Sequence, residues 1–201
     1  MAKDELVLLY QIDPSSEKGQ KVREILSRLN IRVKTISPAM LHQKIGHLAG
    51  LPGHSEVDLI YEGNHIPDEV MLMKDLSDNR IDRILKEFRE NGVSRIALKA
   101  VVTKHNQNWP LLDLISELRS EHQIMERYSY LSRAVQQGDQ LLAAASDKSQ
   151  AMAVALSAQG QALTAAIAEA RIILKAKEAL ELADIEKALS RLNQAIADFN
   201  S

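Results

Sequence analysis

The chain has 201 residues, 25 lysines and arginines against 27 aspartates and glutamates, and no cysteine. This length suits one domain of ordinary size with an appendage, or two small domains. The charges nearly cancel both in the first part and in the C-terminal tail, so neither part carries the basic face that a nucleic-acid partner requires. The lack of cysteine excludes disulfides, thiol nucleophiles and cysteine-ligated zinc or iron–sulfur sites, and we expect a cytoplasmic location.

Two segments bear on secretion and on membranes. The apolar run at the N-terminus, Leu6–Tyr10, is followed at once by polar residues and is too short for a signal peptide. Ser149–Ala168 carries no charge, but its apolar residues are mostly alanine and it includes three glutamines. Placing each glutamine side chain in the hydrocarbon of a membrane without a hydrogen-bond partner would cost roughly a few kcal/mol, as for any buried polar group. We therefore predict an alanine-rich packing helix and no membrane partner.

The first part of the chain begins with a β-α-β pattern. An apolar strand is predicted at 6–10, and a helix starts after the turn-and-cap cluster at 13–16. A second strand follows at 31–36. Ser37-Pro38 then opens a short helix that Gly50 can end, because glycine tolerates a positive φ angle.

The same pattern starts again after the irregular stretch 51–69. A strand at 70–73 leads to a helix with Ser77 as its cap and Asn91-Gly92 at its end, and a strand at 96–102 follows. The apolar stripes of the two helices superpose with a constant offset of 59 residues, at Ile25/Ile84, Leu26/Leu85 and Leu29/Phe88. Two β-α-β units are therefore predicted.

The strand sequences also predict the order of the sheet. The strands at 6–10 and 70–73 are apolar on both faces, which is typical of central strands, whereas Arg32 and Lys34 share one face of the strand at 31–36. Right-handed crossovers then favour a four-stranded parallel sheet in the order 2-1-3-4, an α/β fold. The alternative is an antiparallel ferredoxin-like sheet, with room for an extra strand at Val57–Tyr61.

Beyond Trp109-Pro110 alanine and glutamine dominate and no strand is predicted. Pro110 suits the first turn of a helix, and that helix can run on to about Ala145 because no glycine or proline intervenes before Gly138. Its expected partners are a helix at about 149–180 and a last helix capped by Asp184. The predicted domains are an α/β domain at 1–127 and an antiparallel helical bundle at 128–201.

One stretch could bind a ligand at the carboxyl edge of a parallel sheet, where open α/β sheets bind theirs. The residues are Thr103, His105, Asn106, Asn108 and Trp109, four polar side chains beside an apolar wall. A structural role is the favoured interpretation: Asn108 would cap the following helix and Trp109 would fix that helix to the sheet.

A second, weaker candidate is acidic. Asp13 and Asp75 each follow a predicted central strand, with Lys104 after the last strand, so together they could hold Mg²⁺ or receive a phosphoryl group. The same residues also form ordinary turn-and-cap sequences. The histidines at 42, 47, 54 and 65 lack a carboxylate at regular spacing, so we expect no metal site there.

The chain also resembles a known family. LKAVVTKHNQNWPLLDLISELRSEH, together with IGHLAGLPG and the two β-α-β units, is similar to an uncharacterised bacterial family described as a domain of unknown function, over about residues 1–125. The shared pattern is a T-x-x-N-x-x-W-like turn followed by an L-x-x-L-x-x-E-L helix. The resemblance implies a compact cytoplasmic domain without an established activity, and it does not cover the helical tail.

We expect a non-catalytic interaction or scaffold module, because no catalytic triad, nucleophile elbow or phosphate loop is present and no catalytic residue or cofactor is predicted. The tail carries an apolar stripe that can pack in its own bundle, against a partner or against a second copy. Its residues are Met152, Leu156, Leu163, Ile167, Ala170 and Leu174. The alternative is a small-ligand domain for an anion, a nucleotide or a metal, with 51–69 as a lid; an enzyme comes third.

Overall fold

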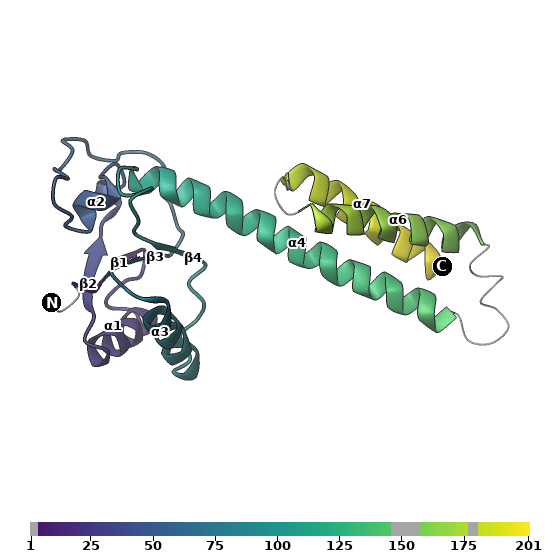
Figure 1. Ribbon diagram of the computed structural model, residues 1–201, viewed down its shortest axis with the longest axis horizontal. Coiled ribbons are helices and arrows are strands. Elements are labelled where there is room, and N and C mark those ends of the chain that lie inside the picture. The colour runs from purple at the N-terminus through teal and green to yellow at the C-terminus, as the bar shows by residue number, and fades with distance from the viewer. Residues whose placement is uncertain (1–3, 146–156, 177–180) are drawn as a thin grey trace. The chain divides into compact units, whose positions relative to one another are not determined.

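The computed structural model describes residues 4–145, 157–176 and 181–201 of the chain, which is built from both helices and strands (Figure 1). The chain divides into two compact units, Met1–Arg119 and Ser120–Ser201. Helix α4 (Leu111–Ala145) contains the boundary between them, so the chain passes from one unit to the next without leaving the helix. The predicted domain boundary, after residue 127, falls within the same helix.

The α/β unit contains the two predicted β-α-β units. Their elements are β1 (Leu6–Tyr10), α1 (Glu17–Arg28), β2 (Arg32–Ile36), β3 (Val70–Lys74), α3 (Asp78–Glu90) and β4 (Leu98–Val101). Ser16 caps α1 by accepting a hydrogen bond from the amide of Gly19 at 3.0 Å, and Ser77 occupies the N-cap position of α3. The predicted short helix after Ser37 is instead a 3-10 turn, η1 (Pro38–Met40), and a separate helix α2 (Ile45–Leu48), because Lys44 between them pairs with Pro110.

The sheet has the predicted order, β2-β1-β3-β4, but not the predicted directions. Within each β-α-β unit the strands are parallel, whereas the central strands β1 and β3 are antiparallel, with Leu8 opposite Leu72. The prediction of an all-parallel sheet is therefore wrong at its central pair. The ferredoxin-like alternative is wrong in its order, since that fold would place a strand of the other unit between β1 and β2.

The connection from β2 to β3 explains the antiparallel pair. Tyr10 is the register partner of both Ile36, where β2 ends, and Val70, where β3 begins, so residues 37–69 leave and re-enter the sheet at the same edge. A parallel β3 would require the chain to return along the whole strand, roughly 17 Å. Residues 37–69 are long enough to do so, so their path and not their length sets the direction: the hydroxyl of Tyr10, at the end of β1, donates to the carbonyl of Ile66 and holds the segment at this edge. The predicted extra strand at 57–61 is absent, and these residues have no regular secondary structure.

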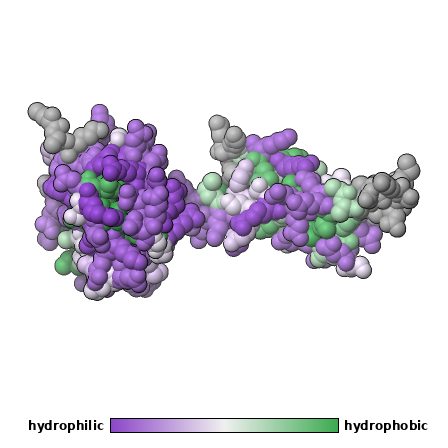
Figure 2. All heavy atoms as spheres, turned by 90° about the horizontal axis from the view of Figure 1, so that it is seen from below, coloured by the Kyte–Doolittle hydropathy of each residue, from purple (hydrophilic) through white to green (hydrophobic). Residues whose placement is uncertain are grey.

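Each face of the sheet has its own apolar core. On one face the side chains of Val7, Leu9, Met71 and Met73 pack against α1 and α3. On the other face Leu8, Leu72 and Leu98 pack against α2, the first turns of α4 and part of the 49–69 connection. In the view of Figure 2 hydrophilic residues cover most of the α/β unit and leave a small apolar area.

The helical unit consists of the second part of α4, α6 (Ala158–Lys175) and α7 (Leu182–Phe199). Tyr128 of α4 donates to the carbonyl of Leu174 at 3.1 Å, and Arg171 pairs with Asp139 further along α4 at 2.7 Å, so α4 and α6 are antiparallel. Helix α7 begins before Asp184, which lies in its first turn rather than at its cap. None of the helices in the described ranges is long and apolar enough to cross a membrane.

The tail's apolar stripe packs within this unit wherever the structure describes it. Leu163, Ile167 and Ala170 are buried in the core of the helical unit, and Leu174 packs against that core. Met152 and Leu156 lie outside the described residues, as do parts of the helix predicted at 149–180.

Candidate functional site

The predicted ligand stretch after β4 is a turn that Asn106 holds closed. The Asn106 side chain is 8% exposed. Its Oδ1 accepts from the amide of Thr103 at 2.9 Å, and its Nδ2 donates to the carbonyl of Val101 at 2.9 Å. Because both ends of this amide are occupied by the backbone of its own turn, Asn106 acts as a structural residue rather than a ligand donor.

The rest of the stretch pairs with residues 41–46. The carbonyl of Trp109 accepts from the amide of Ile45 at 3.0 Å, and the carbonyl of Gln107 accepts from Gly46 at 2.8 Å. The Trp109 side chain is half-buried against the sheet core, and the ring of His105 meets it edge-on with centroids 5.1 Å apart. The backbone hydrogen bonds join the start of α4 to the α2 segment, and the Trp109 ring packs against the core on this face of the sheet, which is the contact that the structural interpretation predicted.

Asn108 has a different role from the predicted one. Its Oδ1 lies 3.2 Å from Nε2 of His54, and helix α4 begins at Leu111. The His54 ring in turn rests on Gly46, where an added Cβ would come within 2.3 Å of the ring. Asn108 therefore ties down the start of the irregular connection instead of capping the helix.

The two predicted carboxylates lie at opposite ends of the strands, that is, on opposite sides of the sheet along the strand direction. Asp13 follows β1 and Asp75 follows β3, and these strands are antiparallel. The Asp13 carboxylate accepts from the amide and the hydroxyl of Ser15, both at 2.8 Å, and these hydrogen bonds lower the pKa of Asp13. The expectation that both carboxylates meet at a switch point is wrong, because it depended on parallel central strands. Lys104 follows β4 at the Asp75 edge and is exposed.

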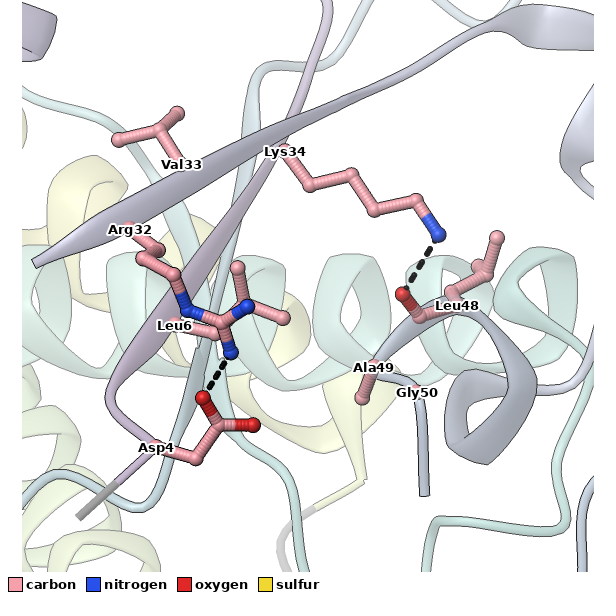
Figure 3. Close-up of a pocket in the computed structure, with 8 residues that line it drawn as sticks. All are labelled: Asp4, Leu6, Arg32, Val33, Lys34, Leu48, Ala49 and Gly50. Carbon is pink, nitrogen blue, oxygen red and sulfur yellow. Dashed lines mark hydrogen bonds and ion pairs between the residues drawn. The ribbon is translucent and has the colours of Figure 1, made fainter. Parts of the chain in front are cut away.

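An ion cluster occupies the Asp75 edge beside an open hollow of about 480 Å³ (Figure 3). Lys74 is 6% exposed, and its Nζ lies 3.0 Å from Oδ2 of Asp4, which also pairs with Arg32. The hydrogen bond from Lys74 is the main cause that lowers the pKa of Asp4. Lys34 donates to the carbonyl of Leu48 at 2.9 Å. The cations drawn at this hollow are thus engaged in joining strands and helix α2, which is a structural task.

The histidines do not assemble into a metal site. His42 meets the ring of Tyr61 edge-on at 5.3 Å, and His54 bonds Asn108. Across the described ranges, no three histidine or acidic side chains are grouped so that they could hold a metal ion.

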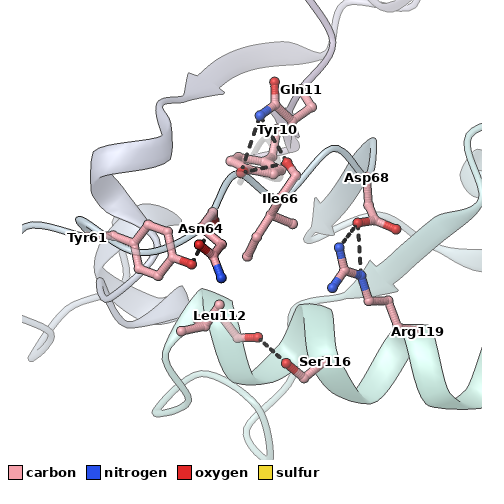
Figure 4. A network of polar contacts seen from close by, with 9 residues as sticks. All are labelled: Tyr10, Gln11, Tyr61, Asn64, Ile66, Asp68, Leu112, Ser116 and Arg119. Atoms are coloured by element: carbon pink, nitrogen blue, oxygen red, sulfur yellow. Dashed lines mark hydrogen bonds and ion pairs between the residues drawn. The ribbon is translucent and has the colours of Figure 1, made fainter.

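The irregular connection 51–69 is anchored near its C-terminal end (Figure 4). The carbonyl of Ile66 accepts from the hydroxyl of Tyr10 at 3.1 Å and from the side chain of Gln11 at 3.0 Å. Arg119 of α4 donates to the carboxylate of Asp68 through Nε at 2.8 Å and also through Nη2. These contacts hold the segment against the sheet edge, which disfavours the predicted role as a lid.

Two further anchors hold the middle of the connection. The buried side chain of Gln43 donates to the carbonyl of Val57 at 2.6 Å and accepts from its amide at 2.8 Å, as a neighbouring strand would. Tyr61 donates its amide to Ala39 at 3.1 Å and its hydroxyl to Asn64 at 2.9 Å. Residues 58–60 therefore form a short arch between two fixed points.

The arch displays apolar side chains to solvent. Leu59 is 53% exposed and Ile60 is 68% exposed, beside a hollow of about 500 Å³ that is also lined by the partly exposed Met40. Three exposed acidic residues, Glu56, Asp58 and Glu62, lie next to these side chains in the sequence. We call this set, residues 56–62 with Met40, the arch surface. The V-D-L-I-Y sequence at 57–61 is typical of a strand, so the sequence alone did not indicate an exposed surface here. The structure shows it, because these residues do not pair with any strand.

The family comparison covers part of the α/β unit. Residues 69–125 match the model of a family described as "Domain of unknown function (DUF3783)". The match contains β3, α3, β4 and the first part of α4. It includes the stretch at 98–122 on which the resemblance rested, but not the stretch IGHLAGLPG at 45–53, which precedes the matched residues. No match was found among curated proteins or among solved structures.

Proposed function

We propose that this chain is a non-catalytic interaction module that binds a protein partner through the arch surface. The observation that supports this best is the exposure of Leu59 and Ile60, 53% and 68%, on a segment whose two ends are hydrogen-bonded in place. Single exposed aliphatic residues are common on protein surfaces. Two adjacent ones with a third beside a hollow are typical of a contact patch.

The anchors make this arch suitable for binding. Full burial of an aliphatic side chain against a partner contributes roughly 1.5–3 kcal/mol. That gain is offset by the entropy lost when a flexible segment becomes ordered on binding. Here Gln43 and Tyr61 hold the arch before any partner arrives, so little ordering remains to oppose association.

The charges indicate the chemistry of the partner. Glu56, Asp58 and Glu62 lie within one short segment that contains no lysine or arginine, and none of the three forms an ion pair with the described part of the chain. A partner with an apolar side chain flanked by lysine or arginine complements this surface. Such complementarity speeds association and excludes acidic competitors.

The proposal extends to the rest of the chain. The helical unit remains a candidate for self-association, although the described part of its stripe is used in its own core. A cytoplasmic location belongs to the proposal and agrees with the absence of cysteine. The small-ligand alternative at the carboxyl edge has weaker support, because Asp13 and Asp75 lie at opposite edges.

A peptide selection tests the interaction. The full chain is used to select from a random peptide library, and the expected products carry one or two large apolar residues flanked by lysine or arginine. Leu59→Ser with Ile60→Ser should weaken these peptides at least about tenfold, the effect of losing two apolar anchors. The matched control is Ile172→Ser, which removes an aliphatic side chain of the helical unit that is 69% exposed, as much as Ile60. Peptides that bind the double variant as tightly as the wild type contradict the proposal.

A further inference from the structure

A further hollow lies between the end of α3 and the start of β4, on the face of the sheet that packs against α1 and α3. It has a volume of about 330 Å³, at the lower end of the range for ligand pockets. Its apolar walls are Leu85, Phe88, Val93 and Ile96, and it is also lined by Ser94. The whole hollow lies within residues 69–125, and it is separate from the arch surface.

The other residues of this hollow are cations. Arg89, Arg95 and Lys99 line it, and none of them forms an ion pair with a carboxylate in the described part of the chain. The neighbouring carboxylates are occupied elsewhere: Glu87 pairs with Arg28 at 3.6 Å, and Glu90 pairs with Lys86 at 3.8 Å. Three positive charges therefore border an apolar hollow without a counter-charge of their own.

The positive charge of Lys99 is in an unfavourable environment. Its Nζ donates to the carbonyl of Ile96, and burial, together with the charges of Arg95 and Lys18, lowers the pKa of Lys99. Of these two neighbouring cations, Lys18 pairs with Glu69, whereas Arg95 has no acidic partner in the described part of the chain. An anion placed beside Lys99 would restore the solvation that burial removes and would offset the repulsion from its neighbours.

The helix dipole accounts for only one of the three cations. Arg89 stands in the last turn of α3, where a positive charge is favoured in any protein. Arg95 and Lys99 lie beyond the helix, in the 91–97 connection and in β4, and have no such reason to border an apolar wall.

We propose that this hollow binds a small single-chain amphiphile with an anionic head, such as a medium-chain carboxylate. The chain lies along Leu85, Phe88, Val93 and Ile96, and the carboxylate faces Arg95 and Lys99. This site is independent of the arch surface, so either can fail without the other.

The wild-type chain with a series of ligands provides the first test. Hexanoate, octanoate and decanoate are titrated calorimetrically below their micelle concentrations, with decylamine and decanol as controls for charge. If the chain is buried, each added methylene should tighten binding about fourfold. Decanoate should bind tightest, and the amide signals of 93–99 should move in NMR spectra while those of 56–62 stay in place. Affinity that does not depend on chain length overturns the proposal, as does equal binding of decanol.

Variants then test the head group. Lys99→Met keeps the aliphatic stem without the charge and should weaken decanoate at least about tenfold, as expected for the loss of a charge-assisted hydrogen bond. Lys99→Arg should bind within about threefold of the wild type, because it restores the cation. Lys86→Met, which changes an exposed lysine of α3, is the matched control and should leave affinity within about twofold. Equal weakening by Lys86→Met and Lys99→Met would mean general charge attraction and would overturn the site. If a variant fails to fold, the wild-type series still decides.

Discussion

Gln43→Leu should loosen the arch without unfolding the sheet around it. The substitution keeps the volume of a buried side chain and removes both of its hydrogen bonds to Val57. A neutral hydrogen bond contributes about 0.5–1.5 kcal/mol net, so two of them contribute about 1–3 kcal/mol. Val57 is half-buried, so water can reach its freed amide and carbonyl in part, and we expect the lower half of that range.

The assay uses the only tryptophan of the chain. Trp109 lies in the α/β unit, so its fluorescence during urea unfolding reports that unit and not the helical one. Gln43→Leu should lower the urea midpoint, and exchange of the Val57 amide should become faster than that of the sheet amides. Gln20→Leu, at an exposed position of α1 in the same unit, is the matched control and should change stability by less than about 0.5 kcal/mol.

Two results would refute this reasoning. An unchanged urea midpoint with unchanged exchange at Val57 would show that Gln43 does not anchor the connection. An unchanged affinity of Gln43→Leu for arch-binding peptides, despite faster exchange, would show that the anchoring does not prepare the surface for binding.

Other predictions follow from the described contacts. Asn106→Ala should destabilise the α/β unit by about 1–3 kcal/mol, whereas His105→Ala should destabilise it by less than about 0.5 kcal/mol. Urea unfolding measures both effects, and the opposite ranking would contradict the structural role of the turn. Trp109→Ala should cost about 2–3 kcal/mol by circular dichroism, less than a fully buried tryptophan, because the ring is half-buried; an unchanged midpoint would show that it does not fix α4. The contact with Lys74 lowers the pKa of Asp4 below its ordinary value of 3.8. The stability that this contact contributes to the folded state is therefore present at pH values above 3.8, and it is lost as the pH falls through the lowered pKa. Asp4→Asn should therefore lose less stability than the wild type between about pH 5 and about pH 3, and equal losses would show that the contact has no effect on stability.

Local sequence patterns were sufficient to predict the four strands of the α/β unit, the two helices α1 and α3, and the order of the sheet, but not the 3-10 turn and the separate helix α2 after Ser37. Ser16 and Ser77 mark the helix starts because serine side chains satisfy the first free amides of a helix. Arg32 and Lys34 identify β2 as an edge strand because charged side chains are costly at the covered centre of a sheet. The tryptophan contact was also predicted, since an aromatic residue before Pro110 at a helix start is typical of a strand-to-helix junction.

The two sites were less predictable, because their residues come together only in the folded chain. Gln43 binds Val57, and Phe88 and Lys99 line one hollow, but no periodicity in the sequence relates the members of either pair. The pairing of Asp13 with Asp75 was predicted wrongly for the same kind of reason, since it depended on the direction of β3.

The sequence by itself determined the four strands and the helices α1 and α3, which strands are central and which faces of these two helices are buried. Only the tertiary structure decided that β3 runs against β1. The physical reason is that a strand's side chains alternate with a period of two, and reversing the strand leaves that alternation unchanged. Direction is instead set by the path of residues 37–69, which the contacts of Gln43, Tyr61 and Ile66 hold at one edge of the sheet.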